Sequence, residues 1–184
     1  MKNRPWEYSD FFATEAEFLG WLRGQLRQIW SDYPIRVEFK NDKCVRVDQA
    51  LRDKYNLSKQ TKYAAECVFC HNWFPKSKLE VDHIIGESSL TSIEHTESYL
   101  DHLMCPPTNM QLTCKPCHKI KTYAERYDMS FEDARTEKSV IAWLKEHTTA
   151  EQIDLLTMAG FEDDEMKNAG ARRKSARKLL KGGS

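Results

Sequence analysis

The sequence contains no long apolar run. No stretch of its 184 residues approaches the roughly 18 consecutive apolar residues that a membrane-spanning helix requires. The N-terminal segment MKNRPWEYSD has no apolar stretch after its basic residues, so no secretory signal is expected. No internal repeat is present. We therefore expect a cytoplasmic protein that does not span a membrane.

The chain also lacks a net charge, because 28 basic residues balance 28 acidic ones. The balance is uneven along the chain: residues 171–184 hold six basic residues and no acidic one, which leaves residues 1–170 with a net charge of −6. The neutral total argues neither for nor against a nucleic-acid partner, whereas the basic tail favours one weakly. A solvated helix face or an unstructured segment would explain the tail equally well.

Six cysteines do not indicate a disulfide scaffold here. With 40% hydrophobic and 30% charged residues, a chain of this length is globular and can build a core without such crosslinks. Two of the cysteines, Cys44 and Cys105, stand alone and are predicted to be buried thiols. The other four form two C-x-x-C pairs, which are typical of metal sites in proteins of the cytosol.

The pattern along the chain predicts an α+β fold with helical flanks. A capping box at Thr14–Glu17 starts a helix that continues to about Trp30. Alternating apolar residues predict an N-terminal β-hairpin from residues 35–39 and 44–47. The later expected elements are a short helix at 48–56, a strand at 79–85, and helices at 97–104, 116–127, 131–146 and 150–158, followed by a C-cap at Gly160.

The two C-x-x-C pairs predict a structural zinc site. A tetrahedral site needs four soft ligands, and each pair supplies two thiolates from one tight turn. The pairs are separated by 43 residues, so the chain between them must fold back, as the predicted strand and returning helix allow. A redox pair or chance core cysteines would explain one such motif more easily than two. The predicted ligands are Cys67, Cys70, Cys114 and Cys117.

Other chemically active residues lie between and beside the two pairs. The strand reads LEVDHII over residues 79–85, and residues 109–122 read NMQLTCKPCHKIKT. The ordered elements C-x-x-C, D-H-I, N-x-x-L-x-C-x-x-C-H and K-x-K-T resemble the HNH nuclease family, also called the ββα-metal fold, which includes phage-encoded, homing and restriction enzymes. The resemblance covers about residues 65–123. After D-H-I, where the family often has proline, this chain has Ile85-Gly86-Glu87 and a longer insertion, so its substrate-facing loop differs.

The resemblance implies a metal-dependent endonuclease that hydrolyses the phosphodiester bonds of DNA. His83 would be the general base, and Asn109 would orient that base and its loop. Asp82 and His118 would hold a catalytic divalent ion, Mg²⁺ or Mn²⁺ or another. Histidine suits the first role because its unperturbed pKa is about 6.5. A divalent ion suits the second because it stabilises the charge of the phosphate and of the leaving oxygen.

Two lysines are expected to bind the substrate. Lys121 shares one face of the predicted helix with His118 and Thr122, and could meet a phosphate beside the metal. Lys119 lies on the same helix and is a second candidate.

These expectations divide the chain into four parts. The parts are an N-terminal helix and hairpin extension (1–61), an HNH module with structural zinc (62–128), a C-terminal helical extension (129–170) and the basic tail (171–184). A rival interpretation is that the chain has the zinc-stabilised fold without catalytic activity and is a module that binds nucleic acid or protein. An isolated Asp-His pair is more often a solvated turn, and a histidine beside a zinc cysteine is often a spare ligand, so the nuclease interpretation depends on the combination.

Overall fold

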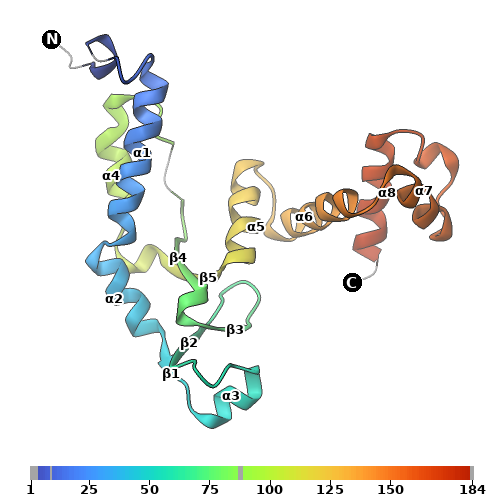
Figure 1. The fold of residues 1–184 in the computed structure, drawn as a ribbon, viewed down its shortest axis with the longest axis horizontal. Helices are drawn as coiled ribbons and strands as arrows, with labels where there is room; N and C mark the ends of the chain where they lie inside the picture. The colour runs from blue at the N-terminus through green and yellow to red at the C-terminus, as the bar shows by residue number, and fades with distance from the viewer. Residues whose placement is uncertain (1–3, 9, 87–88, 183–184) are drawn as a thin grey trace. The chain divides into compact units, whose positions relative to one another are not determined.

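The computed structural model of the chain describes residues 4–8, 10–86 and 89–182. It has a mixed α+β fold, which confirms the predicted class, and it divides into two units, Met1–Lys115 and Pro116–Ser184 (Figure 1). Glu87 and Ser88, in the expected insertion, lie outside the described residues. None of the helices in the described part of the chain is both long and apolar enough to cross a membrane.

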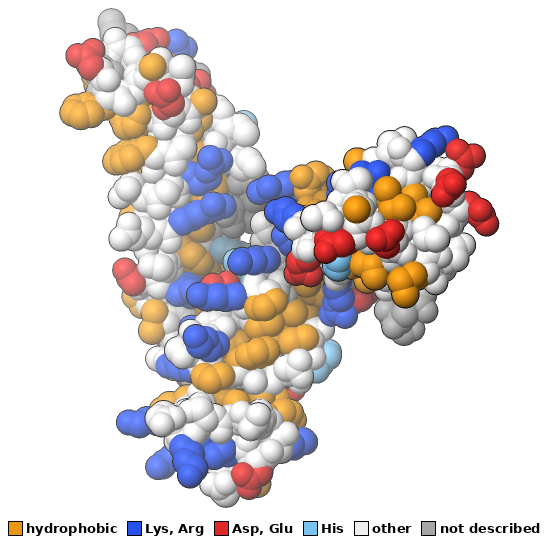
Figure 2. Space-filling view, turned by 45° about the vertical axis from the view of Figure 1, so that its right-hand side comes forward, with side chains coloured by type: hydrophobic (Ala, Val, Ile, Leu, Met, Phe, Trp, Pro, Cys, Tyr) orange, Lys and Arg blue, Asp and Glu red, His pale blue; other side chains and the backbone are white. Residues whose placement is uncertain are grey.

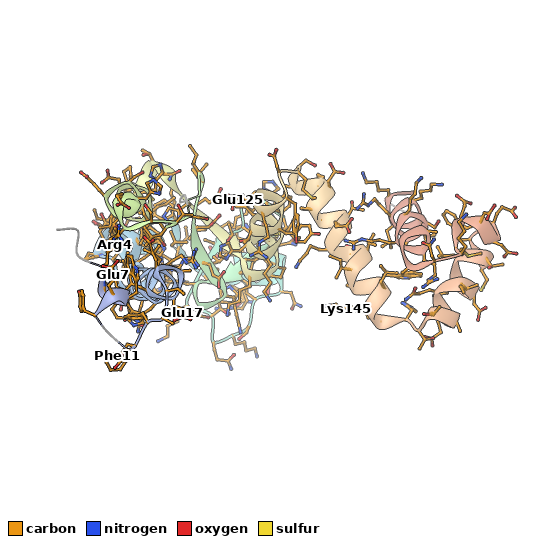
Figure 3. The ribbon with its side chains drawn as sticks, turned by 90° about the horizontal axis from the view of Figure 1, so that it is seen from above. Arg4, Glu7, Phe11, Glu17, Glu125 and Lys145 are labelled. Atoms are coloured by element: carbon orange, nitrogen blue, oxygen red, sulfur yellow. The ribbon has the colours of Figure 1, made fainter. Side chains whose placement is uncertain are left out.

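The first helix, α1 (Glu15–Ser31), is confirmed with its predicted cap. The hydroxyl of Thr14 accepts a hydrogen bond from the backbone N–H of Glu17, as in a capping box. The Glu17 carboxylate accepts from the backbone N–H of Ala13, one residue before the cap. Helix α4 (Thr96–Leu103) confirms the helix predicted inside the insertion, and it lies beside α1 in both ribbon views (Figures 1 and 3).

The predicted N-terminal β-hairpin is wrong. Its first half belongs to a helix, α2 (Pro34–Lys43), and its second half contributes only a two-residue strand, β1 (Val45–Arg46). The apolar alternation did not reflect burial: Ile35 is 38% and Val37 is 43% exposed, and only Phe39 of the three is buried. Proline at the first helical position favours the helix, because its missing N–H has no intrahelical partner there in any case.

Two small antiparallel sheets form the centre of the first unit. In one, β2 (Tyr63–Glu66) pairs with β1 on one side and with β3 (Trp73–Pro75) on the other. The other is a two-stranded ribbon of β4 (Leu79–His83) and β5 (Met110–Cys114). The ribbon strand β4 therefore ends two residues earlier than predicted, at His83.

Helix α3 (Gln49–Tyr55) confirms the predicted short helix and covers the three-stranded sheet. The side chain of Asp48 caps it by accepting from the backbone N–H of Leu51. A small core forms from Val47, Leu57 and Ala64, with Tyr55 stacked on Trp73 beside it. Short 3-10 turns complete the described chain at Pro5–Glu7 (η1), Lys76–Lys78 (η2), Ile93–His95 (η3), Pro107–Asn109 (η4) and Asp163–Glu165 (η5).

The second unit consists of helices. α5 (Lys115–Arg126), α6 (Phe131–Glu146) and α7 (Thr149–Met158) confirm three predicted helices to within about one residue at each end. Gly160 follows α7 with a φ of 85°, a left-handed conformation that ends a helix and suits glycine. The described part of the basic tail, residues 171–182, is also helical. It forms most of α8 (Ala169–Gly182), which packs against α6 and α7.

Candidate metal centre and candidate active site

The four cysteines of the two C-x-x-C pairs lie together, as the sequence predicted. All four sulfur atoms lie within 4.8 Å of one another, and the sulfurs of Cys70 and Cys114 are 4.0 Å apart. A tetrahedral zinc with Zn–S bonds of about 2.3 Å places its sulfurs roughly 3.8 Å apart. The donor set and its spacing therefore fit a metal such as zinc.

The first pair is held by a tight turn between β2 and β3. His71 closes the turn with a φ of 56°, and its backbone N–H donates to the carbonyl of Cys67 at 2.9 Å. The N–H of Cys67 donates in turn to the carbonyl of Asn72. The His71 ring is exposed and bonds the Glu66 carboxylate at 2.6 Å.

The second pair lies where β5 passes into α5. Cys114 is the last residue of β5, and Cys117 lies in the first turn of the helix. The two pairs are joined by backbone bonds: the N–H of Val68 donates to the carbonyl of Leu112, and the N–H of Cys114 donates to the Cys67 sulfur at 3.3 Å. The fold-back that the 43-residue separation required is thus made by the ribbon.

The environment of Cys67 favours the thiolate form that binds metal. Burial acts to raise the pKa of this thiol, but the backbone N–H groups of Cys114, Cys70 and Phe69 donate to its sulfur and lower the pKa from about 9 to about 7. Anionic sulfur is the form that coordinates zinc. Within the described ranges this is the one group of three or more His, Cys, Asp or Glu side chains positioned to share an ion.

Asp82, His83 and Asn109 gather at the opposite end of the ribbon. The strand register pairs Leu79 with Cys114 at the metal end and His83 with Met110 at the other. With a rise of about 3.3 Å per residue, the two ends are roughly 13 Å apart. The ribbon therefore separates a candidate structural site from a candidate chemical site.

His83 is held by contacts on two sides. Its ring stacks on Trp30 of α1 with a centroid distance of 4.6 Å, and its Nε2 donates to the carbonyl of Leu103, at the end of α4, at 2.9 Å. Because a carbonyl only accepts, Nε2 carries the hydrogen, and Nδ1 is the basic nitrogen of the neutral ring. The side chain is nevertheless buried, with 5% of its surface exposed.

Asn109, the last residue of η4, links this turn to the segment that leaves β4. Its Oδ1 accepts from the N–H of Ile85 at 2.9 Å, its Nδ2 donates to the carbonyl of Ile85 at 3.1 Å, and its own carbonyl accepts from the N–H of Ile84. One amide thus fixes the backbone directly after His83. The orienting role that the resemblance implies for Asn109 stays a prediction.

Asp82 points to the face of the ribbon opposite to His83. Alternation along a strand places adjacent side chains on opposite faces, and the register places Gln111 beside Asp82. The Gln111 amide donates to Asp82 Oδ2 at 2.8 Å, and Asp82 is only 7% exposed. A ligand that engages both Asp82 and His83 must therefore lie around the end of β4.

The remaining predicted residues lie on α5. His118 directly follows the metal-site cysteine and is half-buried, and Lys119 is exposed. Lys121 is 8% exposed and donates to the carboxylate of Glu125, one turn further along the helix (labelled in Figure 3). A phosphate at Lys121 would have to replace Glu125 as its partner, so Lys119 is the more accessible of the two.

The sequence arguments missed two residues at this site. Trp30 was named only as the approximate end of the first predicted helix, and it packs directly on His83. Gln111 was not assigned a role, although it lies in the N-x-x-L motif. A strand register that pairs D-H-I with this motif would have placed Gln111 beside Asp82. For Trp30 the sequence carries no such signal, because the contact joins residues that are 53 positions apart.

No protein-family model matches the chain, and neither does any curated protein or solved structure.

Proposed function

We propose that this protein is an HNH-type, metal-dependent DNA endonuclease whose fold is stabilised by zinc on its four cysteines. The observation that carries the proposal is the fixing of His83. Its Nε2 donates to a backbone carbonyl and its ring stacks on Trp30, so the imidazole has a fixed direction at the end of β4. The order strand, strand, helix of β4, β5 and α5, with the motif residues along it, supports the same family.

In this reaction His83 Nδ1 takes a proton from the water that attacks the phosphorus. The Leu103 carbonyl stabilises the imidazolium that forms, because it accepts from Nε2 throughout. Asn109 keeps the backbone after His83 in place, and Gln111 fixes the direction of the Asp82 carboxylate. Preorganisation of this kind lowers the cost of reaching the reactive geometry.

The residues that would hold the catalytic divalent ion are Asp82 and His118. A carboxylate and an imidazole suit Mg²⁺, Mn²⁺ or another divalent ion. When bound, such an ion supplies Lewis-acid stabilisation of the phosphate and the leaving oxygen. Two protein ligands leave positions open for phosphate and water, in contrast to the closed set of four cysteines.

A second candidate is a zinc-stabilised binding module without turnover. The burial of His83 between Trp30 and Leu103 favours it, because a general base has to reach water. In that case the stacked histidine is a core residue, and the Asp82–Gln111 pair is a structural contact. The protein would then bind nucleic acid or protein through other surfaces.

Conversion of supercoiled plasmid DNA to nicked and linear forms tests the proposal. We expect cleavage by the zinc-loaded protein with Mg²⁺ or Mn²⁺. His83→Gln should lower turnover by about 10²-fold or more, the scale of general-base loss, because glutamine can keep a donor for the Leu103 carbonyl but offers no base. His95→Gln is the matched control, since this exposed histidine bonds Thr91 away from the ribbon.

Zinc content and circular dichroism of each variant show whether the fold is retained. No cleavage by the folded wild-type protein with any divalent ion favours the binding module. Normal cleavage by His83→Gln means that another residue activates the water.

A further inference from the structure

Two adjoining hollows on the first unit are lined by basic residues outside the proposed active site. One has a volume of about 700 Å³ and the other about 360 Å³, and they share Thr61, Lys62 and Tyr63. None of the described residues lining either hollow is acidic. We call the pair the basic groove; its principal cations are Arg46, Arg52, Lys59, Lys62, Lys76 and Lys78.

Within the described ranges, the groove's cations are not paired with carboxylates. In the described part of the chain, none of the six forms an ion pair; Arg52 bonds the carbonyls of Ser58 and Thr61, and Lys76 bonds the side-chain oxygen of Asn41. Figure 2 shows that Lys and Arg side chains gather on one face of the first unit, over α1, α2 and the α3 end. An anionic partner is the complement of such a surface.

An exposed aromatic ring lies among these cations. Tyr63 borders both hollows and is 50% exposed, whereas its strand neighbour Ala64 is fully buried. The register pairs Tyr63 with Arg46 across β1 and β2. Cations that follow a phosphate backbone, combined with an aromatic ring on which a base can stack, are the features of single-strand binding surfaces. A paired base inside a duplex cannot stack on such a ring.

We infer that the basic groove binds a single-stranded segment of nucleic acid, with its phosphates on the cations and one base on Tyr63. The inference goes beyond the proposed function, because it concerns binding and holds without turnover. The groove also adjoins the ribbon, since η2 carries Lys76 and Lys78 and leads directly into β4. A strand held there would belong to a substrate with an unpaired segment.

Fluorescence anisotropy with labelled oligothymidine and with a duplex of equal length tests this inference. The protein is the full zinc-loaded chain carrying His83→Gln, without added divalent ion, so the result does not depend on cleavage. The triple variant Arg46→Gln, Lys62→Gln, Lys78→Gln removes three exposed cations. Its matched control is Lys145→Gln, Lys167→Gln, Lys174→Gln, which also removes three exposed cations, all of them in the second unit (Lys145 is labelled in Figure 3).

Each phosphate contact contributes about 0.7 to the log–log salt slope on a single strand. The triple variant should therefore flatten the slope by about 2 and weaken binding about 100-fold near 0.1 M salt. Tyr63→Leu should weaken binding about 5- to 150-fold, and Tyr63→Phe should keep it, because stacking needs the ring alone. The control variant should bind as the parent does.

Three results would overturn the inference. The first is equal binding by parent and triple variant. The second is duplex binding as tight as single-strand binding with no effect of Tyr63→Leu, which would assign the groove to duplex phosphates. The third is a groove-dependent association with phosphatidylserine vesicles and none with oligothymidine, which would assign it to a membrane surface. Unchanged groove binding in a protein that cleaves no plasmid refutes only the proposed nuclease activity.

Discussion

Glu137 provides a quantitative test of how the second unit is held together. This residue of α6 is 2% exposed, and its carboxylate accepts hydrogen bonds from Arg173 and Arg177 of α8. Asp133, one turn earlier on the same helix, pairs with Lys181 of α8 at 2.8 Å but is 55% exposed. The two acids thus join the same pair of helices, and they differ mainly in burial.

The expected cost of Glu137→Gln follows from this geometry. A hydrogen bond to a charged group contributes about 1.5–3 kcal/mol, and two arginines share this carboxylate. Their side chains are 46% and 50% exposed, so solvent screening reduces each contribution, and we expect a total loss of about 2–4 kcal/mol. Asp133→Asn breaks a pair that is exposed to solvent and should cost much less, because water screens such pairs.

Hydrogen exchange of the full-length protein, followed by mass spectrometry of peptides from α6 and α8, measures the difference locally. A loss of about 2–4 kcal/mol corresponds to exchange that is about 30- to 700-fold faster in these helices. Peptides from β4 and β5 report on the first unit and serve as the internal reference. Equal effects of Glu137→Gln and Asp133→Asn would refute the argument that burial gives the Glu137 pairs their strength.

Three further predictions concern the candidate sites and the helical unit. Metal analysis of the purified protein should find about one zinc per chain. Cys67→Ser should lose the zinc, and the control Cys105→Ser should keep it. A folded wild-type protein without zinc would contradict the site. Asn109→Ala should lower plasmid cleavage at least about tenfold with zinc content unchanged, because the backbone after His83 loses two hydrogen bonds. Unchanged cleavage would show that Asn109 does not orient the base. Acid should destabilise the second unit. Lys181 lowers the pKa of Asp133, Thr148 that of Glu151 and Lys178 that of Glu165. The stabilisation from these ionised carboxylates is complete above pH about 4–5 and is lost as the pH falls through their lowered pKa values. A circular-dichroism melting series that stays flat over this range would contradict it.

The sequence predicted the helices because their signals are local. Thr14 and Asp48 cap helices with their own side chains, and Gly160 ends one through its backbone conformation. The cysteine cluster was predictable for a different reason: two C-x-x-C pairs restrict the chain to folds that bring them together. The hairpin prediction failed where the local signal was ambiguous, since the alternating Ile35 and Val37 are exposed in a helix that buries another face.

Contacts between distant residues could not be predicted in this way. Trp30 packs on His83, and the Leu103 carbonyl accepts from the same ring, yet nothing in their local sequence indicates either partner. The direction of the candidate base thus depends on tertiary packing. Motif spacing predicts which residue types lie near the reaction, whereas the orientation of each side chain is fixed by elements that carry no motif.

Counting charges along the sequence also fails to locate a nucleic-acid-binding surface, because it does not show which cations are paired with carboxylates. Among the tail's six basic residues, Arg173, Arg177, Lys178 and Lys181 form ion pairs with carboxylates of α6 and η5. The basic groove lies in a part of the chain without a basic run, and no acidic residue lines it among those that the structure describes. Deleting residues 171–184 would also leave Glu137 buried without its arginines, so loss of DNA affinity in that truncation would report unfolding as much as contact. The full-length charge variants separate the two effects, because they leave the Glu137 pairs intact.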